Sequence, residues 1–492
     1  MPKNIVIFSD GTGQAGGLKP DQNVSNIYKL YRACRSEPES DIDPAEQIAF
    51  YDAGLGTEAD GGPIPYKPLQ TIRKFYSGAT GTGLMRNVAD CYQAILKHYE
   101  PGDRIYLFGF SRGAYTARCV GGVLGLCGVP TRGEDGGPLP RYGQALRAIA
   151  DEAVQRVYEH GAGCGKDEHT QQRKEKARRF REKYASNDAQ GNANAVPYFI
   201  GVFDTVASLG APLPRRILML AGLASIAAVG AFIAASIGNA VFGLPTKETA
   251  WTLLGLGVLM MGVDYVRSHY KSISEFPQAG KSDWHFTTWR FKFYDENLNP
   301  RVQFARHALA IDETRKDFAR VKWASPNDWP ARLGEPEWLR QVWFAGNHSD
   351  IGGSYAQDES RLSDIALDWM VKQTQEPSHK LLVDFSRLKL FPDPLGMQHC
   401  EVKSMRDSFP SWLPRKWRPV WSQKLREINP EAPLHPSVLA RFEAAEGASF
   451  YGLRTLYRPA NLTLHQKVAA LYEATHEVAA AAAPANVQPG PA

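Results

Sequence analysis

The chain has 492 residues, more than a single hydrophobic core usually supports, so we expect one large decorated domain or two to three smaller units. A hydrophobic fraction of 43% and a charged fraction of 22% exclude a wholly disordered chain. The net charge of +5 is modest for this length and gives no reason to expect nucleic acid as a partner. The cysteines lack metal-ligand and CxxC spacing, which predicts reduced, mostly buried thiols.

Segments of strand character recur along the chain, with helical or loop segments between them. They lie at 4–9, 47–51, 104–108, 197–203, 289–294 and 341–344. Nearly continuous apolar strands that alternate with helices predict an α/β fold with a mostly parallel sheet and helices on both faces. Catalytic groups gather at the carboxyl ends of such strands, and most of these segments are followed by a Gly-rich or acidic turn.

The segment 105–118 carries the most informative local pattern. An apolar run leads into Gly109-x-Ser111-x-Gly113 and then into a stretch that can begin a helix. This is the strand, sharp turn and helix of a nucleophile elbow, so Ser111 is predicted to be a serine nucleophile. The glycines fit because side chains beside so tight a turn would collide with the neighbouring strand and helix. The alternative is a glycine-rich strand–helix turn with an incidental serine.

A serine nucleophile needs a general base, and the base needs an acid that orients it. In α/β-hydrolases the chain order is Ser, then Asp or Glu, then His. After Ser111, Asp204 is the acid that directly ends a strand of buried type, at 199–203. His348 lies in a Gly-rich loop just past the strand that ends at Phe344. The sequence therefore predicts the triad Ser111, Asp204 and His348, which requires no metal or other cofactor.

Each partner has an alternative interpretation. Asp204 could cap a turn through its side chain, with Thr205. His307 competes with His348, but its surroundings suggest the apolar face of a helix and a structural role. His435, on a predicted loop, is a minor competitor. Asp350 could support the catalytic histidine or hold its loop.

The oxyanion hole needs two backbone N–H donors, one of them from the residue after the nucleophile, which is Arg112. The turn formed by Gly11 and Thr12 after the first strand can supply the second, and Asp10 is a supporting carboxylate in the same turn. A phosphate-cradling role is weak, because the first turn lacks the dinucleotide-binding spacing and 78–83 lacks a Gly-Lys-Ser/Thr ending.

A long apolar insertion follows the predicted acid. Residues 217–244 contain no charged residue or histidine and are long enough to cross a bilayer, and a second apolar run occupies 250–263. A helical hairpin over 211–271, turning at 245–249, is therefore expected in the membrane. Basic residues on both flanks place them in the cytoplasm by the positive-inside rule, which predicts a membrane protein with its catalytic domain facing the cytoplasm. The alternatives are a buried core hairpin and an apolar lid over the active site.

These features divide the chain into segments. We predict a catalytic domain from 1–210 and 272–375, a cap or peripheral region at 376–478, and a disordered Ala/Pro tail at 479–492. Residues 166–184, dense in Arg, Lys and Glu, predict a solvated helix before the strand that ends at Asp204.

Six motifs in order resemble the α/β-hydrolase domain of class 1 type VI secretion phospholipase effectors and their bacterial relatives. They are IVIFSDGT (5–12), GFSRGA (109–114), GVFDTV (201–206), HALAIDE (307–313), VWFAGNHSDIGG (342–353) and LSDIALDW (362–369). The resemblance covers roughly residues 3–375. It implies an α/β-hydrolase fold, and it maps the nucleophile to Ser111, the acid to Asp204 and the base to His348.

The resemblance also implies the activity and the partners. It implies a serine hydrolase acting on lipid esters, with phospholipid as substrate, and it brings in a secretion-system component, a chaperone or an immunity protein as partners. A membrane-associated phospholipase A is the leading hypothesis. Because the proteins it resembles are bacterial, the expected location is the bacterial inner membrane, with the catalytic domain facing the cytoplasm. The alternatives are a catalytically inactive, membrane-tethered scaffold that keeps the hydrolase fold, and an effector delivered by type VI secretion into another cell. The oligomeric state stays open.

Overall fold

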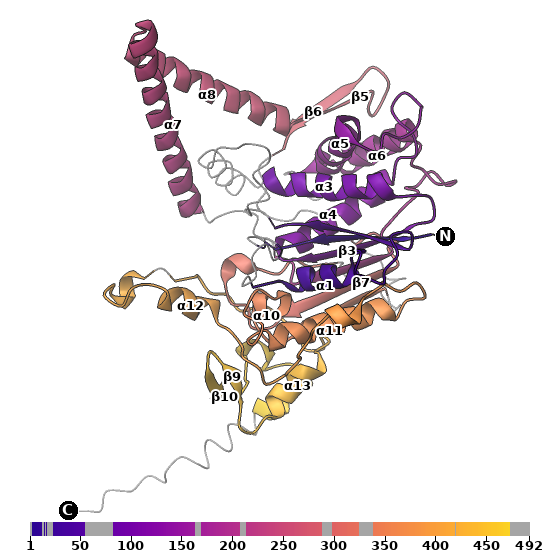
Figure 1. Cartoon of the computed structure of the whole chain (residues 1–492), viewed down its shortest axis with the longest axis vertical. Coiled ribbons are helices and arrows are strands. Elements are labelled where there is room, and N and C mark those ends of the chain that lie inside the picture. Colours follow the sequence, from indigo (N-terminus) through magenta and orange to yellow (C-terminus); the bar gives the residue numbers. More distant parts are fainter. Residues whose placement is uncertain are drawn as a thin grey trace, which may run out of the picture.

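A computed structural model describes residues 2–11, 14, 16, 23–54, 82–162, 169–206, 213–287, 298–323, 338–418 and 420–472. Within these residues, six strands form one parallel sheet in the order β2-β1-β3-β4-β7-β8 (Figure 1). The strands are β1 (Asn4–Ser9), β2 (Gln47–Asp52), β3 (Arg104–Phe110), β4 (Phe199–Phe203), β7 (Phe304–Ala310) and β8 (Leu339–Phe344). The predicted α/β class and mostly parallel sheet are confirmed.

The strand β7 is the main departure from the predicted elements. The sequence around His307 suggested the apolar face of a helix, and this prediction is wrong, because His307 lies in the middle of β7 between β4 and β8. A central strand of a parallel sheet is buried on both faces, so it shows no two-residue periodicity, and its alanines favour a helical interpretation. The strand predicted at 289–294 lies outside the described residues.

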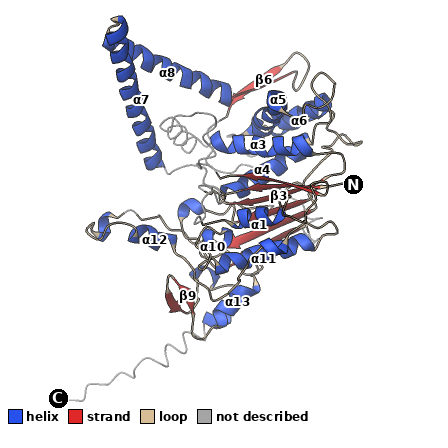
Figure 2. Ribbon diagram, in the orientation of Figure 1, coloured by secondary structure: helices blue, strands red, loops and turns tan. Residues whose placement is uncertain are grey.

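Helices cover both faces of the sheet (Figure 2). Alternate residues of each strand pack into two separate cores. In β1, Ile5 and Ile7 pack into one core, and Val6 and Phe8 pack into the other. Burial of each such side chain contributes about 1.5–3 kcal/mol. The first core lies under α3 (Thr82–His98), α4 (Arg112–Cys127), α5 (Gly143–Asp151) and α6 (Thr170–Tyr184), and the second under α1 (Asn26–Cys34) and α11 (Arg361–Gln375).

The helix expected at 166–184 is present as α6, which buries Gln172, Ala177, Phe180 and Tyr184 and leaves most of its charged residues at the surface. Short helical turns connect the larger elements. They are Glu152–Val157, Tyr158–Gly161, Lys316–Phe318, Phe385–Arg387, Arg415–Trp417 and Ala460–Leu462. The cysteines within the described residues are free, and four of those five are buried, as expected of reduced thiols.

The apolar insertion forms a helical hairpin of α7 (Leu213–Phe242) and α8 (Thr246–His269), which extends away from the sheet (Figure 1). Two segments, Ala224–Phe242 and Thr246–His269, are long and apolar enough to cross a membrane by length and composition. Only 11% of the apolar window in the first and 0% in the second is buried. A buried core hairpin is therefore excluded for these segments. The ribbon of β5 (Tyr270–Ser274) and β6 (Ser282–Phe286) follows α8.

The region after α11 packs against the edge strand β8. It contains α12 (Glu401–Asp407), α13 (Pro436–Glu443), β9 (Ala448–Phe450) and β10 (Leu453–Thr455). The N–H of Trp343 in β8 donates to the carbonyl of Pro433, and the N–H of His435 donates back to the carbonyl of Trp343. The chain at 433–435 thereby extends the ladder and covers the exposed edge of the sheet. The tail predicted to be disordered, 479–492, lies outside the described residues.

Candidate active site

The turn between β3 and α4 has the geometry that a nucleophile elbow demands. Ser111 adopts φ 59° and ψ −118°, a left-handed conformation that is costly for a non-glycine residue. A Cβ atom at Gly109 would lie 2.3 Å from the carbonyl oxygen of Gly113, and one at Gly113 would lie 2.0 Å from that of Ser9. Both glycines are therefore required for the close packing of β1, β3 and α4 around Ser111.

Asp204 and His348 are in direct contact at the carboxyl edge of the sheet. Asp204 follows β4, and His348 is the first residue of α10 (His348–Gly352), in the loop after β8. The Nδ1 of His348 lies 2.6 Å from Oδ2 of Asp204, and both side chains are buried. Because the carboxylate can only accept, Nδ1 carries the proton in the neutral ring and Nε2 is left as a base.

Ser111 lies at the neighbouring strand end. Phe110 pairs with Phe203, so Ser111 and Asp204 are the next residues on adjacent strands. The ring of Phe110 packs against the imidazole of His348 with centroids 4.7 Å apart. The Nε2 of His348 is buried and has no hydrogen-bond partner within the part of the chain that the structure describes. The edge thus carries all three predicted triad residues, with Asp204 and His348 in contact, whereas no hydrogen bond joins Ser111 to Nε2 of His348 in this structure.

Arg426 is a further member of this cluster, and sequence reasoning missed it. Its two terminal nitrogens bind both carboxylate oxygens of Asp204, at 2.5 Å and 3.0 Å. The backbone N–H of Ala310 also donates to Oδ1. Burial disfavours the charged carboxylate, but Arg426 and the hydrogen bond from His348 outweigh burial and hold the pKa of Asp204 well below its ordinary value. The acid is therefore ionised across the physiological range.

A second set of side chains surrounds the histidine from the loop after β7. Glu313 accepts the backbone N–H of His348 at 3.3 Å and pairs with Arg315 through both oxygens. The guanidinium of Arg315 lies 3.6 Å from the ring centroid of Phe318, and Phe318 meets the His348 ring edge-on at 5.1 Å. These contacts fix the orientation of the imidazole and exclude water from one side of it.

The predicted oxyanion turn lies beside the serine. A Cβ at Gly11 would come within 3.4 Å of the Cβ of Ser111. The N–H of Gly11 itself donates to Oδ1 of Asp10 at 2.7 Å, so this donor is engaged within its own turn. Thr12 lies outside the described residues. Arg112 is the first residue of α4, where backbone N–H groups have no carbonyl partner within the helix.

Asp10 is a buried carboxylate in this turn. It accepts the hydroxyl of Ser25 at 2.5 Å and that of Tyr51 at 2.7 Å, in addition to the N–H of Gly11. Burial outweighs these three hydrogen bonds and raises the pKa of Asp10 to about 6. Asp10 therefore supports the loop beside Ser111, and its protonation changes in the weakly acidic range.

The competing histidines and Asp350 have other contacts. The Nε2 of buried His307 accepts the N–H of Thr205 at 3.3 Å, and burial lowers the pKa of His307 well below its ordinary value. His435 caps α13 through Ser437 and stacks on Phe344. Asp350 completes a capping box with Asn347 and binds His399 at 2.7 Å, so it holds the loop that carries His348.

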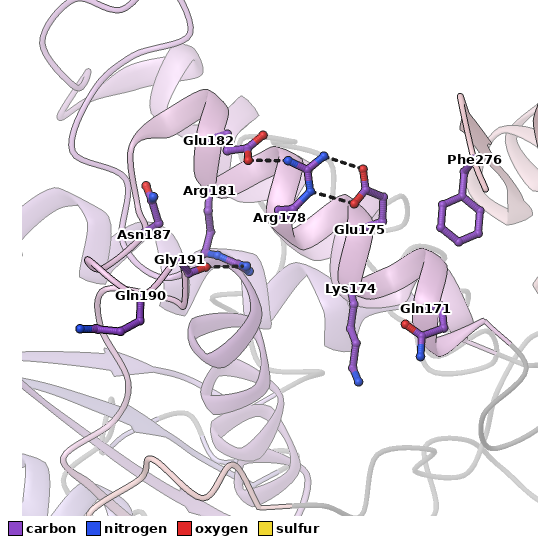
Figure 3. Close-up of a pocket in the computed structure, with 10 residues that line it drawn as sticks. All are labelled: Gln171, Lys174, Glu175, Arg178, Arg181, Glu182, Asn187, Gln190, Gly191 and Phe276. Atoms are coloured by element: carbon purple, nitrogen blue, oxygen red, sulfur yellow. Dashed lines mark hydrogen bonds and ion pairs between the residues drawn. The ribbon is translucent and has the colours of Figure 1, made fainter. Parts of the chain in front are cut away.

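A groove of about 520 Å³ lies along α6 (Figure 3). Its lining residues include no serine nucleophile and no acid-paired histidine like those at the carboxyl edge of the sheet. Its central cation, Arg178, is already paired with Glu175 and Glu182 along the helix, as the dashed lines show. Arg181 donates to the carbonyls of Leu126 and Gly191. Exposed helix pairs of this kind contribute only about 0.3–0.5 kcal/mol each, which is typical of a solvated surface.

A serine on a strained turn after a central parallel strand, with an acid-paired histidine at the neighbouring edge, defines the α/β-hydrolase class. Comparison with known families makes the assignment specific. The model of the family described as "T6SS, Phospholipase effector Tle1-like, catalytic domain" matches residues 3–244 and 257–373, and the chain belongs to this family. The resemblance seen in the six motifs is confirmed. The description of the family refers to phospholipase effectors of type VI secretion.

Individual relatives are distant and longer. The uncharacterized protein YEL023C of Saccharomyces cerevisiae is 31% identical over 134 residues, which make up 27% of this chain and 18% of that protein. A solved structure of an uncharacterized protein from Pseudomonas aeruginosa is 15% identical, with a TM-score of 0.32, over 79% of this chain and 47% of that one. The Tle1 effector bound to the VgrG spike of the type 6 secretion system is 16% identical, with a TM-score of 0.28, over 74% and 53%. The chain thus spans about half the length of these two structures.

Proposed function

We propose that the protein is a serine-dependent carboxylic ester hydrolase that acts on membrane lipids as a phospholipase A, through the triad Ser111, Asp204 and His348. The observation that carries the proposal is the 2.6 Å contact between Asp204 and Nδ1 of His348, beside the elbow of Ser111. The Nε2 of the same ring is buried and has no hydrogen-bond partner among the described residues. The family supports a lipid-ester substrate. The type of phospholipase and the serine mechanism are our inference.

The geometry supports a two-step acyl transfer. The Nε2 of His348 takes the proton from Ser111 as its oxygen attacks the acyl carbonyl, and it returns the proton to the leaving alcohol. Asp204, kept ionised by Arg426, orients the imidazole and stabilises its charged form. The amide of Arg112 and a donor from the turn at Gly11 and Thr12 stabilise the tetrahedral oxyanion. Water then releases the acyl group from Ser111 by the reverse proton transfers.

The α7–α8 hairpin supports membrane association. Its exposed apolar helices would be unfavourable in water and are long enough to enter a bilayer. We propose that the hairpin holds the hydrolase at its substrate, in the bacterial inner membrane with the catalytic domain on the cytoplasmic side or, for an effector delivered by type VI secretion, in the membrane of the recipient. Protease protection on native membranes tests the first arrangement. Cleavage at 245–249 from the cytoplasmic side would contradict a spanning hairpin.

The test of the activity is a pair of serine variants. Ser111→Ala is expected to abolish both labelling by a fluorophosphonate probe and release of fatty acid from phospholipid, while the circular dichroism spectrum stays that of the folded protein. Ser411→Ala, at an exposed turn, is the matched control and is expected to keep both. Undiminished activity in Ser111→Ala would end the triad proposal. Absence of labelling in the unmodified protein would favour the alternative, a tethered scaffold without turnover.

A further inference from the structure

A cationic cavity of about 200 Å³ lies against the triad on the side of Asp204. Two of its lining residues touch the triad itself, since Arg426 binds Asp204 and Phe318 packs on His348. In liquid water this volume would hold about seven molecules, so it can accept a small polar group together with some of its hydration. One side chain therefore separates the cavity from Asp204 and from the ring of His348.

The lining of the cavity is strongly basic. The described lining residues include six cations and one carboxylate, and they are Arg315, Lys316, Phe318, Ala319, Arg320, Lys322, Lys424, Leu425, Arg426 and Glu427. Glu313 and Asp204 neutralise Arg315 and Arg426. Within the described ranges, no carboxylate forms an ion pair with the other four cations, which are Lys316, Arg320, Lys322 and Lys424. An excess of positive charge therefore faces the cavity.

Arg320 is one of the four cations that form no ion pair within the described ranges. It is partly buried, and its guanidinium lies 5.2 Å from the ring centroid of Trp343. Burial and the neighbouring charge of Arg426 lower the pKa of Arg320. The Nε of Arg426, in a side chain that is 5% exposed, is also a buried donor without a partner in the described residues. An anion in the cavity would reduce the repulsion between the guanidinium groups of Arg320 and Arg426, and it could accept a hydrogen bond from the Nε of Arg426.

The backbone holds these cations in place from two distant segments. The N–H of Lys316 donates to the carbonyl of Ser422, and the N–H of Lys424 donates to the carbonyl of Thr314. Buried Arg118 binds the carbonyls of Val321 and Lys322 at 3.4 Å and 2.8 Å. These contacts order the backbone that carries the cations, so a ligand that binds them has less backbone entropy to remove.

We propose that this cavity is a phosphate subsite that receives the head-group phosphate of a glycerophospholipid while its ester lies at Ser111. The proposal rests on the proposed ester hydrolysis and adds the recognition of substrate to it. In such a lipid the phosphate is only a few bonds from the ester carbonyls, which suits a subsite that borders the triad. Arg320, Lys316 and Lys424 would bind the phosphate oxygens, and the protein would prefer phospholipids to diacylglycerol.

The test compares phosphatidylglycerol with diacylglycerol of the same acyl chains, each in neutral detergent micelles. In Lys316→Gln/Lys424→Gln, the ratio of kcat/KM for the two lipids is expected to fall about tenfold, because charge-assisted hydrogen bonds are lost. Lys97→Gln/Lys389→Gln removes the same charge from exposed sites elsewhere and is expected to leave the ratio as it was. Equal ratios in the unmodified protein and in the first variant would overturn the proposal.

Soluble phosphates separate the two sources of the anion. Glycerol 3-phosphate and inorganic phosphate are expected to raise the KM for phosphatidylglycerol, and to do so more weakly in the Lys316→Gln/Lys424→Gln variant. Phosphate that binds without raising KM would identify a free-phosphate site and overturn the head-group assignment. Titration of the Ser111→Ala protein with glycerol 3-phosphate, followed by phosphorus NMR, needs no turnover. If the Ser111→Ala protein binds glycerol 3-phosphate but the unmodified protein hydrolyses no ester, the proposed hydrolase function is wrong and the phosphate site is kept.

Discussion

The carboxyl edge of the sheet and the α7–α8 hairpin differ in where their functional groups lie: those of the edge are buried, and the apolar side chains of the hairpin are exposed. At the edge, the Asp204 carboxylate is held by His348, Arg426 and the N–H of Ala310, and all of these contacts lie inside the protein. In the hairpin, Val258 is 70% exposed and Met260 is 72% exposed. The charged groups at the edge are hydrogen-bonded to other parts of the protein, so the edge is preorganised for catalysis. The apolar side chains of the hairpin are removed from water only when they enter an apolar medium such as a bilayer. Changes at the edge should therefore alter turnover, and changes in the hairpin should alter location.

The largest effect is expected for Asp204→Asn. The amide cannot hold Nδ1 of His348 in the protonated tautomer, nor stabilise the charged ring, so kcat should fall by about 10⁴-fold. The variant also leaves Arg426 without its counter-charge, which costs about 3–5 kcal/mol of stability. Fatty acid release measured together with thermal unfolding separates the two effects. The control is Asp350→Asn, because Asp350 lies in the loop that carries His348 but binds His399. This variant should keep most of the activity. An equal loss of activity in both variants would argue against a special role for Asp204.

Val258→Arg probes the other region. A charge at the centre of an apolar helix costs about 3 kcal/mol on insertion, so binding to lipid vesicles should weaken by about a hundredfold while hydrolysis of a soluble short-chain ester continues. Flotation with vesicles measures the binding. The control is Val420→Arg, because Val420 is also exposed, at 51%, but lies in the region after α11. Equal vesicle binding by both variants would mean that the hairpin does not hold the protein on the lipid.

The two regions also differ in how far the sequence could predict them. The elbow and the hairpin are local, since Gly109, Ser111 and Gly113 are close in the chain and an uncharged apolar run needs no partner to be recognised. Asp204 and His348 followed from strand ends and chain order. Arg426 could not be predicted, because it lies 222 residues from Asp204 and reaches it only after the C-terminal region has packed on β8. In the sequence it stands between Leu425 and Glu427, like an ordinary surface charge.

Arg426→Gln tests whether this distant arginine positions the acid. The variant should lower kcat/KM by about tenfold to a hundredfold, the range for residues that orient a functional group. Because Arg426 holds the pKa of Asp204 low, its loss should raise that pKa and move the acid limb of the pH profile to higher pH. Arg426→Lys keeps the charge without the two-pronged contact and should restore part of the shift. A lower rate with an unmoved acid limb would point to a packing role alone. Arg418→Gln is the control, since every partner of Arg418 among the described residues is a backbone carbonyl.

The smallest effect concerns Asp10, a buried carboxylate that, unlike Asp204, forms no ion pair among the described residues. Its pKa is raised from 3.8 to about 6, so between these values the native state keeps a proton that the unfolded chain has released. Its contribution to stability is therefore present below about pH 4 and is lost as the pH rises through 6, by about 3 kcal/mol or a few degrees in melting temperature. Asp204 acts in the opposite sense. Because its pKa is lowered, its ionised carboxylate stabilises the fold at every pH above the ordinary pKa of an aspartate, and this stabilisation is lost only at strongly acid pH.

The variant Asp10→Asn has a side chain that cannot ionise. The difference between its melting temperature and that of the unmodified protein should therefore rise by a few degrees from pH 4 to pH 7. Any cost of the substitution that does not depend on pH leaves this rise unchanged. Asp43→Asn, at an exposed turn, is the control for replacing an aspartate by asparagine. If the Asp10→Asn difference does not change with pH, the carboxylate is charged in the fold and a neighbouring donor compensates it.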